Sequence, residues 1–239
     1  MLDLECADVD SFKPVIMEIG AVNFNIDTGE ELSSFSTLIN FESCIEKGLE
    51  TNPETMGFLH GNKTLAATLE KSKASPVTIV EALVNFTNWI KECQFNNPRM
   101  TPKPEVLVWG NGSVSDNVWI KSAYRACGMG NEIPWMYYGD RCVRTVVQEC
   151  FDVTGRNYGR EEKRVGTVHV AVDDCRHQVR YLVKARNELA GRAAQPNDSF
   201  SVPPIGAEKM VSVTAEEGEP DRKRKRIDTA EIAKRWRRD

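Results

Sequence analysis

Two carboxylates near the start of the chain have a spacing suited to binding a divalent cation. Asp3 and Glu5 flank Leu4. Because alternate side chains of a β-strand share a face, both acids would project together, with Leu2 and Leu4 facing the core. Carboxylates placed in this way can bridge hard cations such as Mg²⁺ or Mn²⁺. A solvent-facing edge strand is the commoner explanation of a lone Asp-x-Glu pair, so this pair alone does not specify a site.

A third carboxylate, Asp116, follows the glycine-containing segment Gly110–Gly112 and precedes an expected helix over 117–127. One interpretation is a helix N-cap, a position at which aspartate is favoured. The other is a ligand delivered at the carboxyl end of the strand expected over 105–109, where α/β sheets place their ligands. The residues themselves favour the N-cap.

A histidine and two acids open the last helix expected in the chain, over 170–189. His169 precedes it, and Asp173 and Asp174 lie on opposite flanks of its apolar stripe (172, 175, 179, 182 and 183), so helical periodicity does not choose between the two acids. A histidine beside carboxylates suits general-base catalysis at a metal site. An ordinary polar helix start, with the acids interacting favourably with the helix dipole, explains the same residues.

The elements that would position these residues alternate between strand and helix signals. We expect strands at 1–5, at 15–25 and ending near 39, followed by helices at 54–60 and 76–93. A strand at 105–109, the helix at 117–127, a short strand near 135–138 and helices at 142–151 and 170–189 complete the body. This order predicts an α/β fold, with a mixed sheet and helices on both faces.

Composition excludes several classes of protein. The chain has 239 residues, with 31 Lys and Arg against 35 Asp and Glu, so its net charge of −4 does not suit a generic polyanion binder. No apolar run approaches the roughly 20 residues of a membrane span, and no basic region precedes an apolar start, so we expect neither a membrane protein nor a secreted one. The seven cysteines lack Cys-x-x-Cys spacing, which indicates reduced thiols in an intracellular protein.

The composition shifts near residue 190. Residues 190–227 lack an apolar period and are expected to form a disordered linker that contains the basic run 222–226. Residues 228–239 are expected to form a short basic helix or tail, which Asp228 would cap. The basic groups and Trp236 would suit nucleic-acid phosphates and bases, while a solvated tail that aids solubility explains them equally.

The order of these motifs resembles the DEDD superfamily of 3′→5′ exonucleases, in its histidine-containing (DEDDh) branch. The motifs are Asp-x-Glu on the first strand, Asp116 beyond a middle strand and His-x-Ala-x-x-Asp on a late helix. The segments Glu18–Val22, Val108–Gly112 and Trp135–Thr145 are similar to the ribonuclease T-like subgroup, which includes small mycobacterial and phage exonucleases. The resemblance covers about residues 1–189, which we therefore expect to form the exonuclease domain.

The resemblance implies a ribonuclease H-like fold, a five-stranded mixed sheet whose second strand is antiparallel to the rest. It implies two divalent cations, Mg²⁺ or Mn²⁺, and a histidine general base, and the family's His-to-Asp spacing of five selects Asp174 over Asp173. The implied metal ligands are Asp3, Glu5, Asp116 and Asp174, with His169 as the base. The implied substrate is single-stranded or 3′-overhanging RNA or DNA, cut to nucleoside 5′-monophosphates in a bacterial or phage-infected cytoplasm. A homodimer is compatible with this resemblance.

Other residues leave alternatives open. Met56 and Phe58 lie where the family places residues that wedge against terminal bases, or they belong to the core. Arg141 and Arg144 would hold phosphates or carboxylates, or form surface ion pairs. The family's first strand starts several residues before its aspartate, so we expect here a short strand or a start upstream of Met1.

Two other functions compete with the exonuclease as explanations of the sequence. A catalytically degenerate nuclease fold would bind nucleic acid through its basic tail, and substitution at any of the five implied site positions would have favoured it. A scaffold protein would leave this set of acids unexplained. All five residues are present, so we favour the enzyme.

Overall fold

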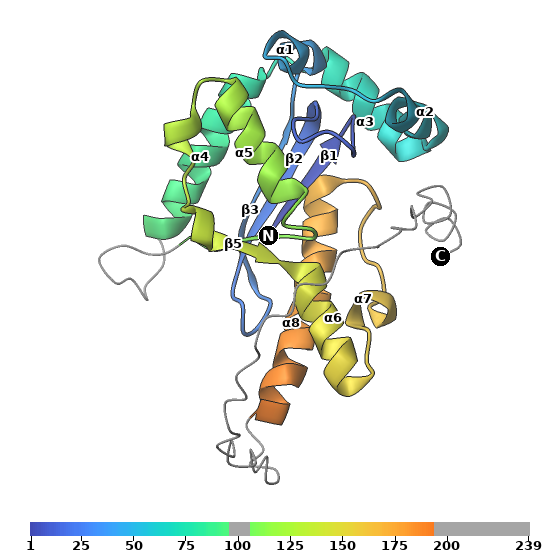
Figure 1. Cartoon of the computed structure of the whole chain (residues 1–239), viewed down its shortest axis with the longest axis vertical. Helices are drawn as coiled ribbons and strands as arrows, with labels where there is room; N and C mark the ends of the chain where they lie inside the picture. Colours follow the sequence, from blue (N-terminus) through green and yellow to red (C-terminus); the bar gives the residue numbers. More distant parts are fainter. Residues whose placement is uncertain (96–105, 194–239) are drawn as a thin grey trace, which may run out of the picture. The chain divides into compact units, whose positions relative to one another are not determined.

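The three strands expected at the start of the chain form one edge and the centre of a five-stranded sheet in the computed structural model, which describes residues 1–95 and 106–193 (Figure 1). They are β1 (Leu2–Cys6), β2 (Ile16–Phe24) and β3 (Glu31–Leu38), and the sheet is completed by β4 (Val108–Gly110) and β5 (Asp140–Cys142) in the order β3-β2-β1-β4-β5. Strand β2 runs antiparallel to β1 and β3, whereas β1, β4 and β5 are parallel. The predicted ribonuclease H-like α/β sheet is confirmed.

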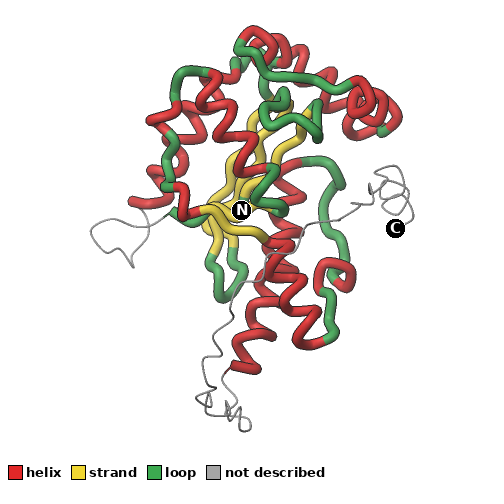
Figure 2. Tube along the Cα trace, viewed as in Figure 1, coloured by secondary structure: helices red, strands yellow, loops and turns green. Residues whose placement is uncertain are grey.

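Helices cover both faces of this sheet (Figure 2). They are α1 (Phe41–Glu46), α2 (Pro53–Gly61), α3 (Lys63–Ala74), α4 (Ile79–Phe95), α5 (Asp116–Ala126), α6 (Val143–Thr154), α7 (Tyr158–Glu161) and α8 (Ala171–Ala193), with 3₁₀ turns at Gly130–Glu132 and Tyr137–Gly139. One apolar cluster joins the sheet to residues of α1 to α5. A second joins the opposite face to α6, α7 and α8.

Strand β1 separates apolar from acidic side chains as its alternation predicts. Leu2 and Leu4 belong to the cluster shared with α1 to α5. Asp3 points to the other face, where it contacts α8. One set of alternate side chains of β1 therefore packs in the core, and the other set presents carboxylates on the opposite face.

One expected element was wrong, and helices α1, α3 and α7 were not expected. The aromatic run at 135–138 is not a strand: it forms bends and part of a 3₁₀ turn, and β5 begins at Asp140. Tyr137 and Tyr138 are exposed there, so their β propensity is not used in the sheet. Helix α3 was not anticipated, because it buries Thr68 and Ser72 beside its two leucines and so lacks a clear apolar stripe.

The last helix extends beyond its expected end. Helix α8 continues to Ala193, so it includes the first four residues assigned to the linker. The rest of the expected linker and the basic segment 228–239 lie outside the described residues. Within the described residues, no helix is both long and apolar enough to cross a membrane.

Candidate active site

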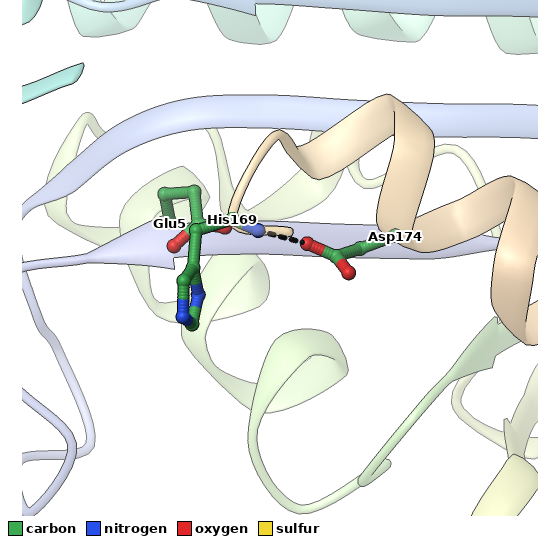
Figure 3. Close-up of side chains that lie close together, drawn as sticks. All are labelled: Glu5, His169 and Asp174. Carbon is green, nitrogen blue, oxygen red and sulfur yellow. Dashed lines mark hydrogen bonds between the residues drawn. The ribbon is translucent and has the colours of Figure 1, made fainter. Parts of the chain in front are cut away.

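The five residues singled out in the sequence come from three separate parts of the fold, and three of them have ligand atoms close together. Asp3 and Glu5 lie on β1, and Asp116 is the first residue of α5. Asp174 lies in the first turn of α8, and His169 precedes that helix. Ligand atoms of Glu5, His169 and Asp174 all lie within 4.8 Å of one another (Figure 3). Asp3 and Asp116 interact electrostatically with this group.

Two glycines permit the close approach of the helices that carry Asp174 and Asp116. A Cβ at Gly20, which pairs with Asp3 across β1 and β2, would lie 2.3 Å from the backbone of Ala171 at the start of α8. A Cβ at Gly110 would lie 2.3 Å from Asn117 in α5. Because only glycine lacks this atom, each helix start can lie directly on a strand.

A hydrogen bond and an unusual backbone conformation position His169. Its backbone φ is 63°, the only positive φ of a non-glycine residue among the described residues. Its N–H donates to Oδ2 of Asp174 at 2.9 Å (Figure 3). A non-glycine residue in this region costs on the order of 1 kcal/mol, and such strain is concentrated at functional sites.

The structure distinguishes Asp174 from its neighbour. Asp173 accepts a hydrogen bond from the N–H of Thr167 and an ion pair from Arg176, so it anchors the loop that leads to α8. Asp174 faces Glu5 and His169 instead. Of the two acids that periodicity did not separate, Asp174 is therefore the one that lies next to Glu5 and His169.

Burial raises the pKa values of three of the carboxyls, and repulsion by neighbouring carboxylates adds to the shift at Asp3 and Glu5. Desolvation, followed by the charges of Asp116, Glu5 and Asp174, raises the pKa of Asp3 well above its usual range. Desolvation and the charge of Asp174 raise the pKa of Glu5 to about 8. Desolvation raises the pKa of Asp116 to about 6, although backbone N–H groups of Gly112 and Leu4 oppose the shift. Cations would relieve this repulsion.

Two residues of the site were missed in the sequence. Gln178, 5% exposed, donates its Nε2–H to Oδ1 of Asp3 at 2.7 Å. Arg164 contacts Oδ1 of Asp174 through Nη1 at 2.5 Å. Gln178 lies one helical turn after Asp174, so an i,i+4 search on α8 would have found it. No local signal identifies Arg164, which comes from the irregular loop between α7 and α8.

The other candidates separate into contacts near the site and contacts elsewhere. The ring centroid of Phe58 lies 6.4 Å from that of His169, and Phe58 is 61% exposed. Met56 packs partly buried against the core. The charge of Arg144 acts on Asp116, whereas Arg141 donates to the backbone carbonyls of Tyr138 and Asp140.

The donor set suits hard divalent cations. Four carboxylates supply the oxygen ligands that Mg²⁺ and Mn²⁺ prefer. Oε1 of Gln178 is also buried with no hydrogen-bond partner among the described residues, on the side chain that contacts Asp3. Water or another donor held beside Asp3 would satisfy this acceptor.

The chain matches one model of a known protein family. Residues 1–185 match the family model described as the 3′-5′ exoribonuclease Rv2179c-like domain. This range contains all five residues of the site and ends within α8. No curated protein matches the sequence.

Proposed function

The chain belongs to the Rv2179c-like 3′-5′ exoribonuclease family and so is a phosphodiester hydrolase, and we propose that it is a metal-dependent enzyme of the histidine-containing DEDD branch. The proposed reaction removes nucleotides stepwise from the 3′ end of single-stranded or 3′-overhanging nucleic acid. The family implies RNA as the substrate, and the experiment described below compares RNA with DNA.

We assign the binding of two divalent cations to Asp3, Glu5, Asp116 and Asp174. The observation that carries this assignment is the grouping of Glu5 and Asp174 beside the imidazole of His169. Burial, followed by the charges of neighbouring carboxylates, raises the pKa values of Asp3 and Glu5. When bound, the cations would supply Lewis-acid activation of the attacking water and neutralise charge on the leaving oxygen.

His169 is assigned the role of general base. Its imidazole lies within reach of Glu5 and Asp174, so it can take a proton from water that attacks the terminal phosphodiester. Attack breaks the bond between phosphorus and the 3′-oxygen, which releases a nucleoside 5′-monophosphate and leaves a new 3′-hydroxyl. The hydrogen bond from the backbone of His169 to Asp174 holds base and ligand in a fixed relationship.

Phe58 is assigned a contact with the terminal base of the substrate. Phe58 lies on helix α2 and is exposed, and its ring is next to that of His169. An aromatic face stacks on a base of any sequence, which suits an exonuclease that removes successive nucleotides. Arg144, whose charge acts on Asp116, is available to a phosphate near the same site.

The test uses 5′-labelled single-stranded RNA and DNA of matched sequence, with Mg²⁺, Mn²⁺ or EDTA. We expect a ladder that shortens from the 3′ end only with a cation, and none with Asp3→Asn, which keeps the size of the side chain. Relative rates on the two polymers give the sugar preference. Binding without cleavage of either polymer would overturn the assignment and support a degenerate nuclease fold.

A further inference from the structure

The loop between α7 and α8 places the guanidinium of Arg164 beside the carboxylate of Asp174. Arg164 contacts Oδ1 of Asp174 through Nη1, and its side chain is 26% exposed. The other oxygen of Asp174 accepts the backbone N–H of His169. Both oxygens of this carboxylate are therefore engaged by the protein itself.

The guanidinium of Arg164 has one nitrogen without a hydrogen-bond partner among the described residues. Its Nη2 donates to the carbonyl of Thr167 at 2.9 Å, but Nε is buried without a hydrogen-bond partner among the described residues. A guanidinium normally satisfies its donors against a carboxylate or phosphate by paired hydrogen bonds. Arg164 is thus held mainly by the charge of Asp174.

The loop is also held to α8 by contacts that do not involve Arg164. Glu162 pairs with Lys184 on α8, and the N–H of Thr167 donates to Asp173. The N–H of His169 donates to Asp174. These contacts tie the loop to α8 on both sides of Arg164 in the sequence.

We propose that Arg164 is a resident counter-ion that competes with a divalent cation for Asp174. This proposal rests on the metal site that we assign to Asp3, Glu5, Asp116 and Asp174. In the metal-free protein its charge offsets the repulsion among the carboxylates, and a bound cation takes over that role. Because a guanidinium beside a cation site repels the incoming charge, Arg164 raises the metal concentration at which the site fills.

The test compares Mn²⁺ affinity by calorimetric titration in wild type, Arg164→Met and Arg156→Met. Methionine keeps much of the length of the side chain and removes the charge. We expect Arg164→Met to bind Mn²⁺ about three- to tenfold more tightly, since a charge-assisted contact no longer has to be broken, and to have a lower melting temperature in EDTA. Arg156 forms an exposed pair with Glu161 near the same loop, so its variant should bind Mn²⁺ as wild type does.

Equal or weaker Mn²⁺ binding by folded Arg164→Met would overturn the proposal. Absence of Mn²⁺ binding by the wild type would instead overturn the metal site itself. If Arg164→Met does not fold, the guanidinium NMR signals of wild-type Arg164 provide the test during a Mg²⁺ titration. They should change with the same midpoint as binding, and unchanged signals at saturation would reject the competition.

Discussion

Nε2 of Gln178 donates to Oδ1 of Asp3 at 2.7 Å, and this bond joins the last helix of the described chain to its first strand. Gln178 is buried, so its amide orientation is restricted by packing. Hydrogen bonds to ligating carboxylates orient them and tune their affinity for metal. Gln178 is therefore a positioning residue for Asp3.

Replacing Gln178 by leucine should impair the site without removing a ligand. Leucine has a similar size and no donor, so Asp3 loses the bond that orients it. We expect kcat/KM and Mn²⁺ affinity each to fall about tenfold to a hundredfold, measured by steady-state kinetics and calorimetry. Gln148→Leu is the control, because Gln148 is exposed on α6 and bonds Asp152. Wild-type Mn²⁺ affinity in Gln178→Leu would refute the positioning role.

The metal-free protein should lose stability as the pH rises from about 5 to 8. The folded pKa of Glu5 is about 8 and that of Asp3 is also raised, whereas carboxyls in an unfolded chain titrate near 4. Between these values the folded state binds more protons than the unfolded state, so its free energy of unfolding decreases with pH. Calorimetry in EDTA should show this decrease, and Mg²⁺ should restore stability at pH 8.

Glu5→Gln isolates the contribution of one carboxyl to that pH dependence. The amide does not ionise, so the variant should gain at least about 1 kcal/mol relative to wild type between pH 5 and pH 8. Parallel stability profiles for the two proteins would show that the pKa of Glu5 is not raised in the folded state. Addition of Mg²⁺ should stabilise wild type more than the variant.

Gly20→Ala should destabilise the protein because the new Cβ would meet the backbone of α8. The nearest atoms are 2.3 Å away in Ala171 and Val172, and neither the strand nor the helix start can shift without moving Asp3 or Asp174. We expect a loss of about 1 to 3 kcal/mol by chemical denaturation, together with reduced Mn²⁺ affinity.

Gly57→Ala provides the matched control for that substitution. Gly57 lies within α2, and a Cβ there meets no atom within 4 Å. Alanine should stabilise this helix by about 0.5 to 1 kcal/mol. Similar effects of the two substitutions would contradict a specific approach of α8 to β2 at Gly20.

The sequence predicted those parts of the site that depend on local periodicity. The alternation of β1 determines that Asp3 and Glu5 share a face, and the strand signals before residue 40 identify three strands of the sheet correctly. The position of Asp174 opposite Glu5 depends on how α8 lies on β2, which helical phase does not specify. Arg164 belongs to an irregular loop whose course is determined by contacts with α8, so no periodic signal reveals it.

Phe58→Ala and Met56→Ala should separate substrate binding from packing. Phe58 is 61% exposed beside His169, so its loss should leave the melting temperature unchanged and raise KM about fivefold or more, in line with the stacking energy of one base. Met56 packs against the core, so its loss should lower stability by about 1 kcal/mol or more and leave KM nearly unchanged. Equal KM values for Phe58→Ala and wild type would exclude the base contact.

His169→Ala should slow catalysis far more than it weakens cation binding. A general base contributes about a hundredfold to ten-thousandfold to the rate, whereas the carboxylates supply most of the attraction for Mn²⁺. We therefore expect single-turnover rates to fall by that factor and Mn²⁺ affinity to change by less than about fivefold. His60→Ala is the control, because His60 is exposed at the end of α2.

His169→Gly distinguishes the backbone role of this position from its side-chain role. Glycine adopts a φ of 63° without strain, so this variant should be about 1 kcal/mol more stable than His169→Ala while being equally slow. Both variants retain the N–H that donates to Asp174. A loss of Mn²⁺ affinity as large as the loss of rate, in both variants, would make His169 a ligand of the cation instead of the base.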